Sequence, residues 1–164
     1  MRTRQPTAAA DAQAARFDSL EQEVFLSLWR TYDRLRQLED ELFSQFDLTP
    51  QQYNALRLLR AAHPGSLPTL ELSARLVSRA PDITRLLDKL ADRGLITRER
   101  PADNRRQVQV AISESGIALL DQIAAPLHEC HARQLGHMSA TELRQLVNLL
   151  RADRDPHESG AGHW

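Results

Sequence analysis

Residues 90–113 of the 164-residue chain, LADRGLITRERPADNRRQVQVAIS, decide how the rest of the sequence is interpreted. Val108, Val110 and Ile112 alternate with a polar and a small residue, which predicts a half-buried β-strand. Residues 95–100 have the pattern of a second, shorter strand, so the segment predicts a hairpin with a turn over residues 101–107. The turn is rich in charged residues, and in an isolated hairpin it would simply be solvated. Its meaning therefore depends on the segment before it.

Two helices are predicted immediately before this hairpin. The second runs from near Pro81 to Arg93 and ends at Gly94, a residue suited to a left-handed helix cap. The first is short, with Thr69 as its N-cap, and about four residues of turn separate the two. This order predicts a winged helix-turn-helix. If the second helix lies in a major groove of DNA, residues 103–106 extend toward the phosphates and the neighbouring minor groove.

Long amphipathic helices are predicted on both sides of this domain. The first covers about residues 17–46 and would reach about 45 Å. That is more than a single compact domain needs, so we expect part of it to pack on another chain. Its apolar stripe consists of Phe17, Leu20, Val24, Leu28, Leu35, Leu38 and Leu42, spaced by three, four or seven.

Capping boxes mark the starts of two further helices. Thr49 and Gln52 form one, with Pro50 at the first helical position, and Ser139 and Glu142 form the other. These patterns predict helices that begin at residues 50 and 140.

Ser113 is the predicted N-cap of a helix that extends to about residue 135, with an interruption at Pro126. Residues 1–15 and 153–164 lack apolar periodicity, and we predict that both are flexible. The fold class predicted from these elements is mainly α with a small β-hairpin wing.

Composition predicts a soluble, cytoplasmic protein without a membrane segment. The formal net charge is −1, but residues 75–106 hold nine basic and five acidic residues, a local +4 that leaves −5 for the remainder. A modest basic stretch within an acidic body suits an anionic partner that contacts one face. Cys130 is the single cysteine, so no intramolecular disulfide can form.

Two segments, LTPQQYNALRLL (residues 48–59) and ITRLLDKLADRGLITRERPADNRRQVQVAISESG (residues 83–116), resemble the multiple-antibiotic-resistance regulator (MarR) family of transcription factors. The resemblance covers about residues 20–151. It is most specific in the second segment, where the Thr-Arg-Leu start, the Arg-Gly-Leu junction, the double arginine and the Ser-x-x-Gly helix start keep the expected spacings.

The resemblance implies a homodimer whose first and last helices interlock, with two winged domains on a pseudo-palindromic double-stranded DNA operator. Residues 16–48 and 114–152 would then be dimerisation helices, and residues 49–113 the DNA-binding domain. Many relatives are repressors that release DNA when a small, often aromatic or anionic, effector binds. The chain departs from the family pattern at Asn104, where relatives usually carry Asp, and at residues 80–82, where small hydroxyl residues are common.

Candidate DNA contacts lie in the helix-turn-helix and in the turn of the hairpin. Arginine suits both narrow minor grooves and phosphates, and a carboxylate can accept a hydrogen bond from cytosine. For each candidate below, the alternative to DNA contact is a solvated side chain, or one that caps a helix or forms an ion pair within it. The candidates are Ser78, Arg79, Pro81, Asp82, Thr84, Arg85, Lys89, Asn104, Arg105 and Arg106.

Aromatic residues suggest an effector pocket, although aromatics at helical spacing also occur in cores and dimer interfaces. The pocket candidates are Trp29, Tyr32, Phe46 and Tyr53.

The segment from His128 to His131 raises the question of a metal site. His128 and His131 share a helix face, but Cys130 does not, and His137 lies further along the chain. Because a Cys/His site needs three or four converging ligands, we predict no metal and a buried, inert thiol at Cys130.

Two functional hypotheses follow from these patterns. The first is a dimeric transcriptional regulator, most simply a repressor. The alternative is a winged-helix protein-interaction module that does not read DNA. We predict no enzyme and no cofactor, because no Ser/His/Asp set, glycine-rich phosphate loop or carboxylate pair lies on converging elements.

Overall fold

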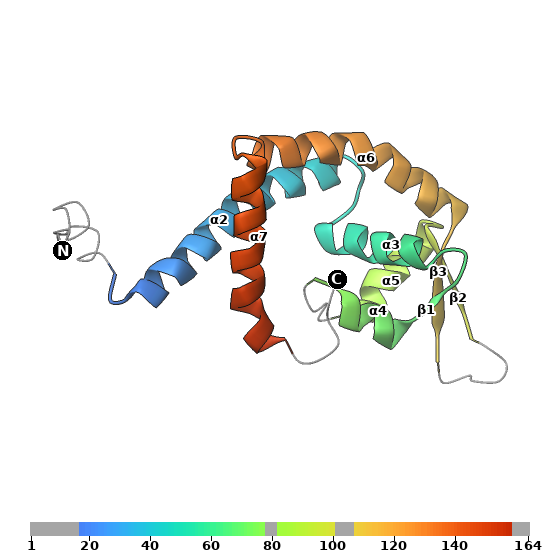
Figure 1. Ribbon diagram of the computed structural model, residues 1–164. Coiled ribbons are helices and arrows are strands. Elements are labelled where there is room, and N and C mark those ends of the chain that lie inside the picture. The colour runs from blue at the N-terminus through green and yellow to red at the C-terminus, as the bar shows by residue number, and fades with distance from the viewer. Residues whose placement is uncertain (1–16, 78–81, 101–106, 159–164) are drawn as a thin grey trace, which may run out of the picture. The chain divides into compact units, whose positions relative to one another are not determined.

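The structure, a computed structural model, describes residues 17–77, 82–100 and 107–158 (Figure 1). The chain divides into two compact units, residues 1–38 and 39–164. Helix α2 (Leu20–Ser44) contributes residues to both, and its bounds agree with the predicted first helix. In the first unit, α2 exposes Leu20, Phe25 and Trp29 to solvent, so much of its apolar surface has no cover within that unit.

The second unit contains the predicted winged helix-turn-helix and the two helices that follow it. Its core forms where α3 contacts β3, α4, α5 and α6. The mainly helical fold class with a small sheet is confirmed. The elements of the winged domain are α3 (Pro50–Ala62), β1 (Leu67–Pro68), α4 (Thr69–Arg75), α5 (Ile83–Asp92), β2 (Ile96–Glu99) and β3 (Gln109–Ile112).

Helix α3 begins as its capping box predicts. The Thr49 hydroxyl accepts a hydrogen bond from the backbone N–H of Gln52 at 3.2 Å, and the Gln52 side chain accepts one from the backbone N–H of Thr49 at 2.9 Å. Leu56 and Leu59 are fully buried on the inner face of the helix. A local exchange of two hydrogen bonds therefore fixes where the central helix of the domain starts.

The sheet has three antiparallel strands in the order β1-β3-β2. The predicted hairpin is confirmed, with Ile96 opposite Ile112 and Glu99 opposite Gln109. Strand β1 was not predicted, because two residues are too few to show a period of two. It pairs Leu67 with Val110 and attaches the hairpin to the start of α4.

The prediction that Thr69 is the N-cap of α4 is wrong. Pro68 holds the cap position, and Thr69 is the first helical residue. The backbone N–H of Thr69 donates to the carbonyl of Val108 at 3.0 Å, and its hydroxyl donates to the same oxygen at 3.2 Å. A tertiary contact with the hairpin thus takes the hydroxyl that we had assigned to local capping.

Helix α6 (Glu114–Leu135) begins at Ser113, as predicted. The Ser113 hydroxyl accepts from the backbone N–H of Gly116 at 3.1 Å and donates to the carbonyl of Gly94 at 2.6 Å. Glycine at 116 is required, because a Cβ there would lie 2.3 Å from the carbonyl oxygen of Leu95. The Ser-x-x-Gly pattern therefore brings the start of α6 directly against Gly94 and Leu95, which follow α5.

The predicted interruption at Pro126 is wrong, because α6 runs through it to Leu135. Proline removes one backbone donor from the helix. Ile123, Leu127 and Cys130, on one face around that position, are all buried and hold the helix against the core. Packing therefore offsets the missing hydrogen bond.

Helix α7 (Ala140–Arg154) starts at the predicted Ser139–Glu142 capping box and buries none of its residues within the chain. A 3-10 turn, η1 (Asp155–His157), follows it. The prediction of a flexible tail from residue 153 is therefore wrong for residues 153–157, which are helical. None of the helices in the part of the chain that the structure describes is long and apolar enough to cross a membrane.

Candidate nucleic-acid interface

Helix α5 has two chemically distinct faces. Leu86, Leu87 and Leu90 are buried against the domain core. Thr84, Arg85 and Lys89 are exposed on the remaining surface. This division follows directly from the i, i+3, i+4 spacing of the leucines. It leaves a hydroxyl and two cations available to a partner outside the core.

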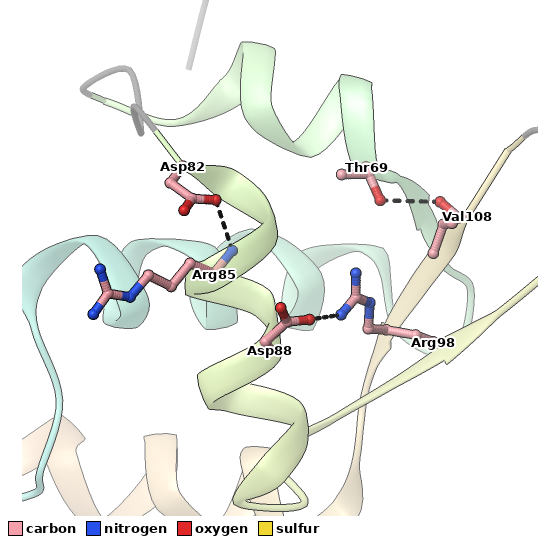
Figure 2. A network of polar contacts seen from close by, with 6 residues as sticks. All are labelled: Thr69, Asp82, Arg85, Asp88, Arg98 and Val108. Carbon is pink, nitrogen blue, oxygen red and sulfur yellow. Dashed lines mark hydrogen bonds and ion pairs between the residues drawn. The ribbon is translucent and has the colours of Figure 1, made fainter.

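The start of α5 differs from the prediction. The helix begins at Ile83, and not near Pro81, with Asp82 as its N-cap. One carboxylate oxygen of Asp82 accepts a hydrogen bond from the backbone N–H of Arg85 at 2.9 Å (Figure 2). Aspartate is a favourable N-cap, so Asp82 in the sequence already indicated a helix that starts at residue 83. The suggestion that Asp82 accepts from cytosine stays a prediction, and one of its oxygens already has this local role.

An ion pair joins α5, the helix predicted to enter the major groove and called the reading helix below, to the hairpin of β2 and β3. Arg98, in the middle of β2, donates to the carboxylate of Asp88, in the middle of α5 (Figure 2). The side chains are 27% and 54% exposed, so the pair lies at the surface that α5 and the hairpin share. Ten residues separate the partners, and no local spacing rule indicates such a contact. The pair neutralises a carboxylate that would otherwise repel a phosphate backbone.

The contact between Thr69 and Val108, visible in Figure 2, holds the hairpin at the residue that precedes β3, on the side of the β2–β3 connection. Strand β2 ends at Glu99 and β3 begins at Gln109. The candidates Asn104, Arg105 and Arg106 lie outside the described residues. The same holds for Ser78, Arg79 and Pro81, between α4 and α5. For these six residues, contact with DNA stays a prediction.

The four aromatic candidates for an effector pocket divide between the two units. Trp29 and Tyr32 lie in the first unit and are 62% and 63% exposed. Trp29 lines a hollow of about 650 Å³ on α2, together with Phe17, Leu26 and Arg30 among others. Tyr32 is not among the residues that line it.

Phe46 and Tyr53 lie in the second unit. Tyr53 stacks on Phe43 with ring centroids 4.7 Å apart, and Phe43 is buried. Burial raises the pKa of the Tyr53 phenol above its ordinary value, with nearby charges as smaller influences. These contacts favour a packing role for Tyr53, and the effector pocket stays a prediction.

His131 lies 3.5 Å from the carboxylate of Glu39, and Cys130 is buried as a free thiol. Across residues 17–77, 82–100 and 107–158, no group of three or more His, Cys, Asp or Glu side chains is placed to hold a metal ion.

A short helix followed along the chain by a leucine-backed helix with exposed cations and then by two antiparallel strands defines a winged helix-turn-helix protein. The MarR family profile matches residues 48–108. A solved structure of a MarR transcription factor from Planctomyces limnophilus is 53% identical over 83% of this chain and 98% of that one, with a TM-score of 0.67. The chain belongs to the MarR family of transcription regulators.

Two more distant structures share the fold. A mutant MarR from E. coli, solved in complex with operator DNA, is 23% identical over 82% of this chain and 98% of that one, with a TM-score of 0.71. BpsR from Bordetella bronchiseptica, whose DNA binding is regulated by 6-hydroxynicotinic acid, is 21% identical over 79% and 97%, with a TM-score of 0.71.

Proposed function

We propose that this protein is a homodimeric repressor that binds a pseudo-palindromic operator in double-stranded DNA and leaves it when a small effector binds. The observation that carries the proposal is the division of α5 into a buried leucine face and an exposed face with Thr84, Arg85 and Lys89. A helix backed by the core in this way can place its polar residues in a major groove. Arg85 and Thr84 then contact bases and backbone, and Lys89 contacts phosphate.

The wing supplies the second group of contacts in this proposal. Arg105 and Arg106 belong to the connection between β2 and β3, where guanidinium groups suit a narrow minor groove or a phosphate. The ion pair between Asp88 and Arg98 supports this arrangement, because it ties the first strand of the hairpin to the reading helix. Asn104, Ser78, Arg79 and Pro81 complete the proposed surface.

A second copy of the chain is proposed as the partner for the incompletely buried apolar surface of α7 and α2. On one face of α7, Leu143, Leu146 and Leu150 are half-buried and Val147 is exposed, and no residue of that helix is fully buried. On α2, Leu20 and Val24 are exposed. Apolar stripes on two helices suit the core of a homodimer, which is more apolar than ordinary surface.

The effector is proposed to be a small aromatic or anionic molecule. Support comes from the relative BpsR, whose DNA binding responds to an aromatic acid. Trp29, Tyr32, Phe46 and Tyr53 stay the candidates to contact it, and the hollow beside Trp29 offers room for a molecule of that size.

Selection of bound fragments from random double-stranded DNA, using the full-length protein, tests the proposal. We expect enrichment of one inverted repeat. Arg85→Ala should then weaken binding by about tenfold and lower the salt slope by about one. Arg57→Ala, which removes an exposed arginine of α3, serves as the control and should change neither.

The alternative is a winged-helix protein-interaction module that does not read DNA. It is favoured by the net charge of −1 and by the exposed carboxylate of Asp82 at the start of α5. Selection without an enriched motif at low salt would support this alternative and contradict the repressor.

A further inference from the structure

Helix α2 ends in a Schellman motif whose left-handed residue is not glycine. The backbone N–H of Leu48 donates to the carbonyl of Phe43 at 3.0 Å, and that of Asp47 donates to Ser44 at 3.2 Å. Asp47 has φ +52°, the conformation that glycine usually supplies at this position. Phe43 and Leu48, the two apolar residues that bracket the turn, are both buried. The chain therefore leaves α2 in one defined direction.

Helix α5 ends in the same way. The backbone N–H of Leu95 donates to the carbonyl of Leu90 at 3.0 Å, and that of Gly94 donates to Ala91 at 2.8 Å. Gly94 has φ +67°, and both leucines are buried. The reading helix and the end of α2 thus finish in two equivalent turns within one unit of the chain.

Arg93 connects these two turns. It is the C-cap residue of α5, and its guanidinium donates to the carbonyl of Asp47 and, at 3.1 Å, to the carbonyl of Phe46. The last turn of α2 has no basic residue of its own, although helix C-terminal carbonyls attract a cation. Arg93 supplies that cation from 46 residues further along the chain. Because the guanidinium is planar and makes two contacts, it constrains orientation as well as distance.

We propose that Arg93 is a positioning residue that sets the direction of the reading helix relative to the end of α2, and thereby the spacing between operator half-sites. This inference rests on the proposed function. In a dimer, the separation of two reading helices must match the separation of the two half-sites. One added base pair turns one half-site by about 35° and moves it by about 3.4 Å. If the reading helix is held rigidly relative to the end of α2, the dimer should lose affinity when the half-site spacing changes. If the helix can rotate there, the dimer should keep more of its affinity.

The test uses the full-length protein and a set of operators in which the selected half-sites are kept and their spacing changes by one or two base pairs. We expect the wild type to lose about tenfold in affinity for each base pair of change. Arg93→Gln should reduce that loss to about threefold or less. Arg60→Gln is the matched control, since Arg60 pairs with Asp121 at 2.8 Å and contacts neither helix end. It should keep the preference of the wild type.

Spacing preference is a property that a purely structural role would not change. If Arg93→Gln weakens binding by the same factor at every spacing, or keeps the wild-type preference, the inference is wrong. Should Arg93→Gln fail to fold, Arg93→Lys decides, because lysine keeps the charge but cannot hold both carbonyls as a fork. A spacing preference of Arg93→Lys that is weaker than that of the wild type but still present supports the inference. A spacing preference equal to that of the wild type contradicts it. Failure of the proposed function is a different result, in which the wild type itself enriches no motif.

Discussion

Helices α5 and α7 both carry leucines on one side, yet the chain fully buries only those of α5 and leaves those of α7 half-buried. The ten residues of α5 bury Leu86, Leu87 and Leu90. The fifteen residues of α7 bury none, and Leu149 is 62% exposed. Apolar surface removed from water stabilises a fold by about 25 cal/mol per Å². Helix α5 therefore draws on the core of its own chain, and α7 needs a partner to gain the same stabilisation.

The comparison separates two uses of the same sequence pattern. One apolar face builds the winged domain and fixes the surface that reads DNA in our proposal. The other is a surface on which a second copy can dock. A single exposed leucine carries no such meaning, since folded proteins expose much apolar surface. On α7, however, Leu143, Leu146 and Leu150 lie along one face with Val147, which is 46% exposed.

The largest difference between the two helices should appear in stability. Leu87 is fully buried, so Leu87→Ala should lower the free energy of unfolding by about 3 kcal/mol through lost burial and a residual cavity. Leu149→Ala, on the exposed side of α7 outside its leucine face, should change it by less than about 0.5 kcal/mol. Urea denaturation followed by circular dichroism, at one fixed protein concentration, measures both. Equal losses would show that burial within the chain does not decide the cost of removing a leucine side chain.

Dimer association, in contrast to unfolding stability, should depend on the leucine face of α7. Leu146→Asp places a charge in the proposed dimer surface and should raise the dissociation constant of the dimer by about a hundredfold. Gln145→Asp adds the same charge one position away, on an exposed part of α7, and should leave the dimer intact. Sedimentation velocity over a range of concentrations distinguishes the two. A wild type that stays monomeric throughout would contradict the dimer itself.

The N-cap of α5 should have a smaller effect, of about 1 kcal/mol. Asp82→Ala removes the acceptor for the backbone N–H of Arg85 and should destabilise the protein by that amount, whereas Asp82→Asn should keep most of the stability. Asp92→Ala, at the other end of the helix, removes a carboxylate from the negative end of the helix dipole and should not destabilise. The melting temperatures of these three variants, measured by thermal unfolding, give the order of their stabilities. Equal melting temperatures for the Asp82 and Asp92 variants would argue against the cap.

Features set by neighbouring residues were predictable from the sequence. The capping boxes at Thr49 and Ser139 and the left-handed Gly94 each depend on residues within one helical turn. Periodicity likewise indicated the buried face of α5. The physical reason is that a helix end must satisfy its own backbone groups, and few residue types can do so.

Contacts between distant segments were not predictable in this way. Arg93 reaches the carbonyls of Phe46 and Asp47, and Thr69 reaches Val108, across 39 to 47 residues. Each of these side chains could equally have capped its own helix or faced solvent, so the sequence alone did not indicate the distant contact. Only the folded arrangement brings a carbonyl within reach. The continuity of α6 through Pro126 has the same origin, because burial on one face outweighs a lost donor.

The smallest expected effect is the pH response of the start of α7. Hydrogen bonds from the side chain and then the backbone of Ser139 lower the pKa of Glu142 below its usual value of 4.5. A carboxylate whose pKa is lowered in the folded state stabilises that state above the unfolded pKa, and this contribution is lost as the pH falls through the folded value. The helix start should therefore loosen between about pH 4.5 and more acidic values. Amide exchange at residues 140–143 across that range measures the loosening. Glu142→Gln should remove the pH dependence while the cap at Thr49, which uses a glutamine, stays constant as the internal control. A response at both caps would point to general acid unfolding and not to Glu142.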